Sequence, residues 1–95
     1  MLYQITHDLP PNHPVLDLLA EQIISIDGIG DKWAHILPSS WLIDTPIKTA
    51  QEIYEYLCPA LPPNTFILVT LFDPNHSAGA LPDETKNWIL RRKTR

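Results

Sequence analysis

The sequence is short of cysteine, glycine and long apolar runs, and each shortage excludes a class of protein. Its one cysteine, Cys58, has no partner for an intramolecular disulfide and leaves no cysteine metal site, which predicts a protein of the reducing cytoplasm. The three glycines form no phosphate-binding loop or dinucleotide fingerprint, so no nucleotide cofactor is expected. The longest apolar run, Phe66 to Val69, is far shorter than the roughly 20 residues of a membrane span, so no membrane partner is expected.

The chain has 95 residues, of which 44% are hydrophobic and 19% charged. This length supports one domain with a single core, and the hydrophobic fraction is too high for a disordered chain. The first eight residues have neither the basic region nor the long apolar region of a secretion signal. We expect one domain over residues 1–90, followed by a short tail over residues 91–95.

Positive charge is scarce in the body of the chain and concentrated in the tail. Residues 1–90 carry three bases against eleven acids, a net charge of −8. The other bases are Arg91, Arg92, Lys93 and Arg95. An acidic body repels phosphate backbones, so nucleic acid would be contacted through this tail. The alternative is a solvated helix end, where cations complement the helix dipole.

Apolar periodicity predicts seven elements. Alternation and β-branched or aromatic residues favour strands at residues 2–6, 33–37, 41–43 and 65–72. Helical stripes predict a first helix with Pro14 at its first position and Gly28 and Gly30 beyond its end, and a second helix capped by Thr45 that ends before Pro59. A third short helix follows residue 82.

This order of elements predicts an α+β protein. Two strand-helix-strand units joined by a hairpin form a ferredoxin-like βαββαβ sandwich, here with an added C-terminal helix. Its four antiparallel strands would lie in the spatial order 4-1-3-2, with both main helices on one face of the sheet.

Both faces of the last strand are apolar, and the hairpin carries Trp33 and Trp41. One layer of helices cannot cover both faces of a sheet, so the third helix or another subunit must cover the second face. We expect a homodimer. Which sheet face forms its interface stays open, and one candidate is the face that carries the hairpin tryptophans.

Strand directions in this fold gather polar residues at one rim of the sheet. The rim residues are His7, Asp8, Asn12, His13, Ser39, Ser40 and Asn64. Asp8 is a candidate oxygen ligand for Mg²⁺ or Mn²⁺, and His7 is a candidate ligand or general base. Turn formation by Asp8 and helix capping by Asn12 or His13 are the alternatives.

Two Pro-Asn-His segments, at residues 11–13 and 74–76, look like a metal-binding pair. The fold places them at opposite rims, because the fourth strand runs antiparallel to the first. Turn formation therefore explains both segments better than a shared metal. His35, inside a strand, is expected to be a hydrogen-bonded sheet residue.

Two segments resemble a known group of proteins. Ile5-Thr6-His7-Asp8-Leu9 and the hairpin from Lys32 to Ile43 are similar to those of small bacterial proteins labelled SinR-like, which are themselves similar to the small CRISPR-associated adaptation endonucleases. The similarity extends over most of residues 2–72. It implies a ferredoxin-like homodimer in which Asp8 faces its symmetry mate and holds a metal ion for phosphodiester cleavage.

The sequence departs from that pattern at two places. The resemblance implies a tyrosine before the aspartate where this chain has His7, and the hairpin supplies no arginine to bind phosphate. Two functions therefore stay open. One is a metal-dependent nuclease or nucleic-acid-binding protein that uses Asp8, His7, Ser39, Ser40 and the tail bases; the other is a non-catalytic interaction or regulatory module of antitoxin-like type.

Overall fold

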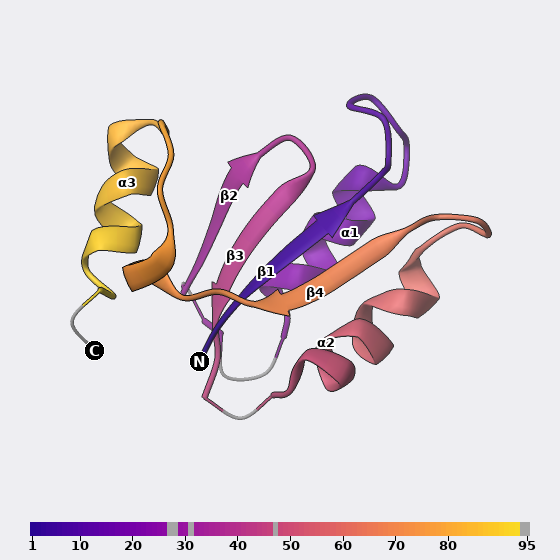
Figure 1. The fold of residues 1–95 in the computed structure, drawn as a ribbon. Helices are drawn as coiled ribbons and strands as arrows, with labels where there is room; N and C mark the ends of the chain where they lie inside the picture. Colours follow the sequence, from indigo (N-terminus) through magenta and orange to yellow (C-terminus); the bar gives the residue numbers. More distant parts are fainter. Residues whose placement is uncertain (27–28, 31, 47, 94–95) are drawn as a thin grey trace.

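The computed structural model describes residues 1–26, 29–30, 32–46 and 48–93. The strands and helices are β1 (Leu2–His7), α1 (Leu16–Ile24), β2 (Trp33–Leu37), β3 (Ser40–Asp44), α2 (Ala50–Leu57), β4 (Ile67–Leu71) and α3 (Asp83–Leu90), as Figure 1 shows. Two short 3-10 helices lie at Cys58–Ala60 and Pro74–His76.

The fold is α+β, with one antiparallel sheet of four strands in the order β2-β3-β1-β4. This confirms the predicted strand order, and the βαββαβ succession resembles that of ferredoxin-like proteins. β1 is a central strand, because Ile5 lies opposite Trp41 of β3 on one side and Val69 of β4 on the other. β2 and β4 form the two edges.

The second helix begins later than predicted, and the expected cap at Thr45 is wrong. Thr45 is fully buried and its N–H donates to the carbonyl of Met1 at 2.9 Å, so it extends the sheet. Thr49 caps α2 instead: its hydroxyl accepts from the N–H of Glu52 at 3.2 Å, and the Glu52 carboxylate accepts from the N–H of Thr49 at 3.0 Å. These two reciprocal bonds form a capping box. Ile47, expected on this helix, lies outside the described residues.

The first helix also begins after its predicted start at Pro14. His13 holds a turn before the helix, because its Nδ1 accepts from the N–H of Val15 at 3.1 Å and its carbonyl accepts from the N–H of Leu16 at 3.1 Å. α1 then buries Leu19 and Ile23. Gly28, expected beyond the end of this helix, lies outside the described residues.

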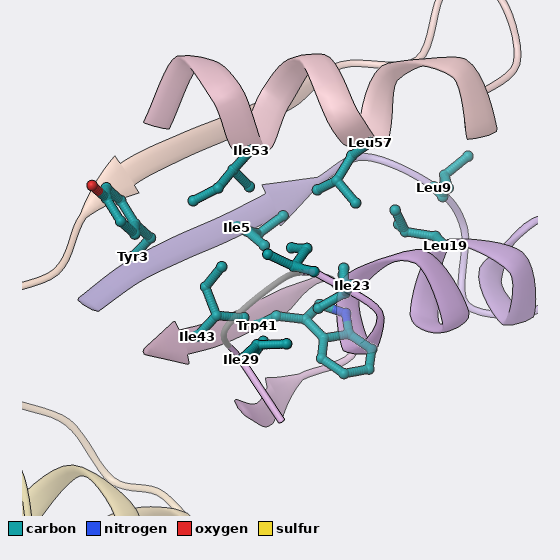
Figure 2. Close-up of a cluster of buried hydrophobic side chains, with 11 residues drawn as sticks. Tyr3, Ile5, Leu9, Leu19, Ile23, Ile29, Trp41, Ile43, Ile53 and Leu57 are labelled. Atoms are coloured by element: carbon teal, nitrogen blue, oxygen red, sulfur yellow. The ribbon is translucent and has the colours of Figure 1, made fainter. Parts of the chain in front are cut away.

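The core lies between the sheet and the pair α1 and α2 (Figure 2). Its largest fully buried side chains include Ile5, Ile23, Ile53 and Leu57. Trp41 also belongs to this core, and Trp33 packs against it with the two ring centroids 5.6 Å apart. The tryptophans thus lie on the helix-covered face, so the core fills this candidate interface.

α3 packs against β2, and the fully buried Leu42 shows that the second face is covered on this side. Trp88, 8% exposed, is the buried residue of α3. On the other half of this face the side chains are open: Phe66, just before β4, is 74% exposed, and Leu68 of β4 is 62% exposed. In the described part of the chain, every helix is too short or too polar to span a bilayer.

Candidate functional site

Asp8 follows β1 and is exposed, as a metal ligand would need to be. Its Oδ1, however, accepts a hydrogen bond from the N–H of Phe66 at 2.9 Å, and its own N–H donates to the Phe66 carbonyl at 3.2 Å. The side chain therefore continues the pairing of β1 with β4 by one residue. This bond uses one carboxylate oxygen for structure.

His7 is buried, with 5% of its surface exposed. Its Nδ1 accepts from the N–H of Leu9 at 3.2 Å, so the neutral ring carries its proton on Nε2. Burial lowers the pKa of His7 below its ordinary value of 6.5; His35 lowers it further and Asp8 opposes the shift. In this tautomer Nε2 is a hydrogen-bond donor and has no lone pair for a metal ion or a substrate proton.

A Mg²⁺ or Mn²⁺ site needs several oxygen or nitrogen ligands converging on one point. Over residues 1–26, 29–30, 32–46 and 48–93, no group of three or more histidine, cysteine or acidic side chains is placed to hold a metal ion. Asp8 and His7 are adjacent in the sequence. The Nδ1 atom of His7 accepts the hydrogen bond from Leu9, and its protonated Nε2 can only donate. Within one chain, the described residues therefore offer a metal ion at this rim the carboxylate of Asp8 but no cluster of three or more such side chains.

The rim itself forms as predicted, because the N–H of His7 donates to the carbonyl of Ser39 at 3.0 Å. Ser40, a candidate nucleic-acid contact, is 2% exposed, and its Oγ accepts from Nε2 of Gln4 at 2.9 Å. Ser39 is half-buried. Asn64 lies in the turn before β4 with a φ of 66°, a left-handed conformation that asparagine tolerates.

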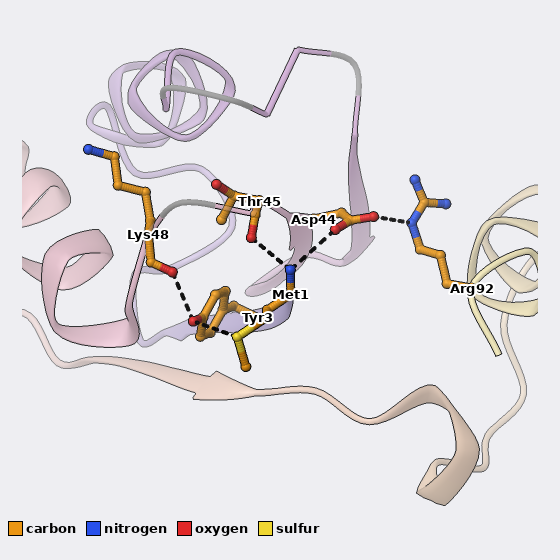
Figure 3. Close-up of polar contacts among 6 residues, drawn as sticks. All are labelled: Met1, Tyr3, Asp44, Thr45, Lys48 and Arg92. Carbon is orange, nitrogen blue, oxygen red and sulfur yellow. Dashed lines mark hydrogen bonds and ion pairs between the residues drawn. The ribbon is translucent and has the colours of Figure 1, made fainter. Parts of the chain in front are cut away.

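The basic tail is divided between the fold and the solvent. Arg92 donates from Nε to Oδ2 of Asp44 at 3.1 Å (Figure 3). Its guanidinium lies 3.6 Å from the ring centroid of Trp88. Arg91 is exposed and Lys93 is half-buried. Arg95 lies outside the described residues. Arg92, one of the tail residues predicted to contact phosphate, is therefore already engaged in an ion pair with Asp44.

The second Pro-Asn-His segment is a local turn, as expected. Asp73 accepts from the N–H of Asn75 at 2.9 Å, and its other oxygen lies 2.6 Å from Nδ1 of His76. The bond to His76, followed by that to Asn75, lowers the pKa of Asp73. Both side chains are exposed.

Two features escaped the sequence analysis. One is an open pocket of about 550 Å³ beside α1, lined in part by His7. It was missed because its lining residues are brought together by the fold and form no sequence motif. The other is the uncovered part of the second sheet face at β4. The apolar residues on both faces of β4 indicated that the second sheet face needed a cover, but they did not show which half of that face α3 covers.

The chain matches no family model and no curated protein. The resemblance of residues 2–72 to the SinR-like group therefore stays a prediction from short segments. The function must be argued from the geometry of the described residues.

Proposed function

We propose that the chain is a cytoplasmic, ferredoxin-like interaction module that binds a second copy of itself through β4. The observation that carries this proposal is the combination of an open sheet edge and exposed apolar side chains on one strand. Phe66 and Leu68 project from the face that α1 and α2 leave uncovered. Leu71, at the end of the same strand, is 63% exposed. Exposed apolar surface of this kind is typical of an interface.

The backbone of β4 is prepared for a further strand. On the side of β1, the Phe66 carbonyl accepts from the N–H of Asp8, and the Phe72 N–H donates to the carbonyl of Leu2. In an antiparallel pair, residues whose backbone groups bond to the neighbouring strand alternate with residues whose backbone groups point away from it. Ile67, Val69 and Leu71 therefore direct their N–H and C=O groups to the open edge. The strand Ile67–Leu71 has no charged residue and no proline, two of the features with which proteins protect an edge from pairing.

The strand is also complementary to itself. A two-fold axis at Val69 would place Ile67 opposite Leu71 of the second copy in antiparallel pairing, so apolar side chains meet on one face. On the other face Leu68 would lie opposite Thr70 of the second copy. No like charges face each other within this pairing, so it joins the two sheets without electrostatic cost.

The same geometry gives less support to catalysis. Asp8 holds the start of β4, His7 bonds to Leu9, and Arg92 pairs with Asp44. Each of these residues, expected to act on nucleic acid, has a structural contact that accounts for its position. The interaction module is therefore the function that these contacts favour.

Light scattering tests the module directly. For a monomer of 10.8 kDa, we expect the purified chain to show twice this mass. Leu68→Lys should yield monomer, because it places a charge in the apolar interface. Leu18→Lys is the matched control, since Leu18 is an exposed leucine of α1, 44% exposed, and its replacement should leave the dimer intact. A wild-type monomer at high concentration would contradict the proposal.

A cleavage assay distinguishes the module from the nuclease. Single-stranded RNA and double-stranded DNA are incubated with the chain, with and without Mg²⁺ or Mn²⁺, and compared with Asp8→Asn. We expect no cleavage in any of these reactions. Metal-dependent cleavage that disappears in Asp8→Asn would replace the module by an enzyme.

A further inference from the structure

An open groove of about 850 Å³ lies between α3 and the residues that lead into this helix, 77–81. Gln4 of β1 and Leu37 of β2 also line it, so the sheet forms part of its wall. Three leucines from β2, β4 and α3 line the groove with much of their surface open: Leu37 is 52%, Leu71 63% and Leu90 45% exposed. Apolar surface gathered in one groove is typical of a binding site.

Positive charge is concentrated at this groove, although the body of the chain is acidic. Residues 1–90 carry three bases against eleven acids, and one of these bases, Lys86, lines the groove together with Lys93. Asp73 is the acidic residue among the described residues that line it, and its carboxylate oxygen lies 2.6 Å from Nδ1 of His76. Two lysines and one aspartate give the groove a charge of +1, whereas the whole chain carries −4. The groove therefore favours a negatively charged partner.

The backbone of residues 77–81 is open to pairing. The chain is extended at Ser77, with φ −120° and ψ 151°, and at Pro82, with φ −55° and ψ 149°. In the described part of the chain, residues 77–81 make no backbone–backbone hydrogen bond. There is also room beside the segment, because a Cβ added at Gly79 would meet nothing within 4 Å. An extended segment of this kind can accept a peptide as an added strand.

We propose that this groove binds an extended acidic peptide, whose backbone pairs with residues 77–81 and whose carboxylates contact Lys86 and Lys93. The two lysines are seven residues apart, about 10–12 Å along the helix and the turn that follows it. Two acidic residues four positions apart in a strand are separated by about 13 Å, which the flexible lysine side chains can span. The side chain midway between the acids points the same way, so an apolar residue there meets the leucines of the groove.

The probe is the blocked peptide acetyl-Glu-Thr-Leu-Thr-Glu-amide, titrated into the full chain and followed by amide NMR shifts. We expect saturable shifts at Leu37, at Leu90 and over residues 77–81. At saturation, hydrogen exchange should slow at alternate residues of this segment, because only alternate N–H groups face an added strand. No saturable shift, or shifts without slower exchange, would overturn the proposal.

Two further ligands separate the features of the peptide. The same peptide with lysine in place of both glutamates should bind at least about tenfold more weakly, because its charges repel those of the groove. Decanoate has a carboxylate and an apolar chain but no backbone, so it should bind more weakly than the acidic peptide and leave the exchange rates unchanged. Equal binding of the two peptides, or tighter binding of decanoate, would contradict an acidic peptide as the ligand.

Lys86→Glu tests the charge contact at an exposed position. It should weaken binding of the acidic peptide about tenfold and strengthen binding of the lysine peptide, since it reverses one charge of the groove. Lys32→Glu is the matched control, because Lys32 is also exposed but absent from the groove lining. Equal effects of the two variants would show that the groove is not the binding site.

The test is independent of the proposed dimer. Leu68 is absent from the groove lining, so Leu68→Lys should bind the acidic peptide as the wild type does, whatever its mass in light scattering. Loss of peptide binding in this variant would contradict the groove as the site.

Discussion

Arg92 joins the end of the chain to the sheet through a contact between residues 48 positions apart. Its side chain is 12% exposed, and that of Asp44 is 4% exposed. Besides the ion pair, its Nη1 donates to the carbonyl of Trp88 at 3.0 Å. Removing one partner of a buried ion pair leaves the other charge buried and unpaired, so it destabilises a protein more than removing one partner of an exposed pair.

Removing this guanidinium should therefore destabilise the fold. We expect Arg92→Ala to lower the free energy of unfolding by about 1.5–3 kcal/mol, the range for hydrogen bonds to charged groups. Arg91→Ala, at the exposed neighbour, should change it by less than about 0.5 kcal/mol. Urea denaturation measures both. Equal effects of the two variants would show that the ion pair adds nothing.

His7 predicts a pH dependence of stability. Its pKa is lowered in the folded state from the ordinary value of 6.5, so the unfolded chain binds the proton more readily. The free energy of unfolding should then fall as the pH drops through about 6.5 and stop falling, for this group, below the folded pKa. Denaturation of the wild type and His7→Asn from about pH 8 to 5 checks this. Identical pH profiles of the two proteins would show that His7 does not cause the pH dependence of stability.

The sequence predicted where the site residues meet but not what they do. The strand directions correctly placed His7 beside Ser39, and the two residues share a backbone hydrogen bond. The role of His7 depends on its burial and on which ring nitrogen is bonded, and both follow from the packing of the folded chain around it. The engagement of Arg92 by Asp44 was equally beyond local pattern, because no motif links residues so far apart in sequence.

Among the elements, α2 depends on its capping box. Thr49→Ala removes the acceptor for the N–H of Glu52 and should lower the free energy of unfolding by about 1 kcal/mol. Gln51→Ala, at an exposed position of the same helix, should change it by less than about 0.5 kcal/mol. Thermal or urea unfolding measures the difference. A Thr49→Ala variant as stable as the wild type would show that the box is not needed.

Strands were predicted more accurately than helix starts. The bounds of β2 are those expected, because the apolar run from Trp33 to Leu37 is followed by a proline turn. Both helices begin later than their prolines suggested. A proline fits the first helical turn but does not require it, and the hydrogen bonds of His13 and Thr49 decide the start.

At the scale of the whole molecule, dimerisation should couple stability to concentration. Unfolding of a dimer releases two chains, so its midpoint temperature should rise with protein concentration. The wild type should show this rise, whereas Leu68→Lys should not. Calorimetry at several concentrations measures it, with Leu18→Lys as the control that retains the rise. A wild-type midpoint independent of concentration would argue for a monomer.

The architecture was predictable because the succession of elements permits few topologies. The coverage of the second sheet face was not. α3 has a single buried residue, Trp88, so its apolar pattern is too weak to show which strands it covers. The exposed state of Leu68 follows from this placement and could be known only from the structure.

The central place of β1 has a consequence for synthesis on the ribosome. This strand is made first, yet its two neighbours are β3 and β4, and β4 is the last strand to emerge. Until residues 67–71 are available, a nascent chain that has paired β2, β3 and β1 leaves one side of β1 unpaired. Completion of this sheet must therefore wait until residues 67–71 have left the ribosome, and we expect chains stalled before β4 to be recruited by chaperones or to aggregate.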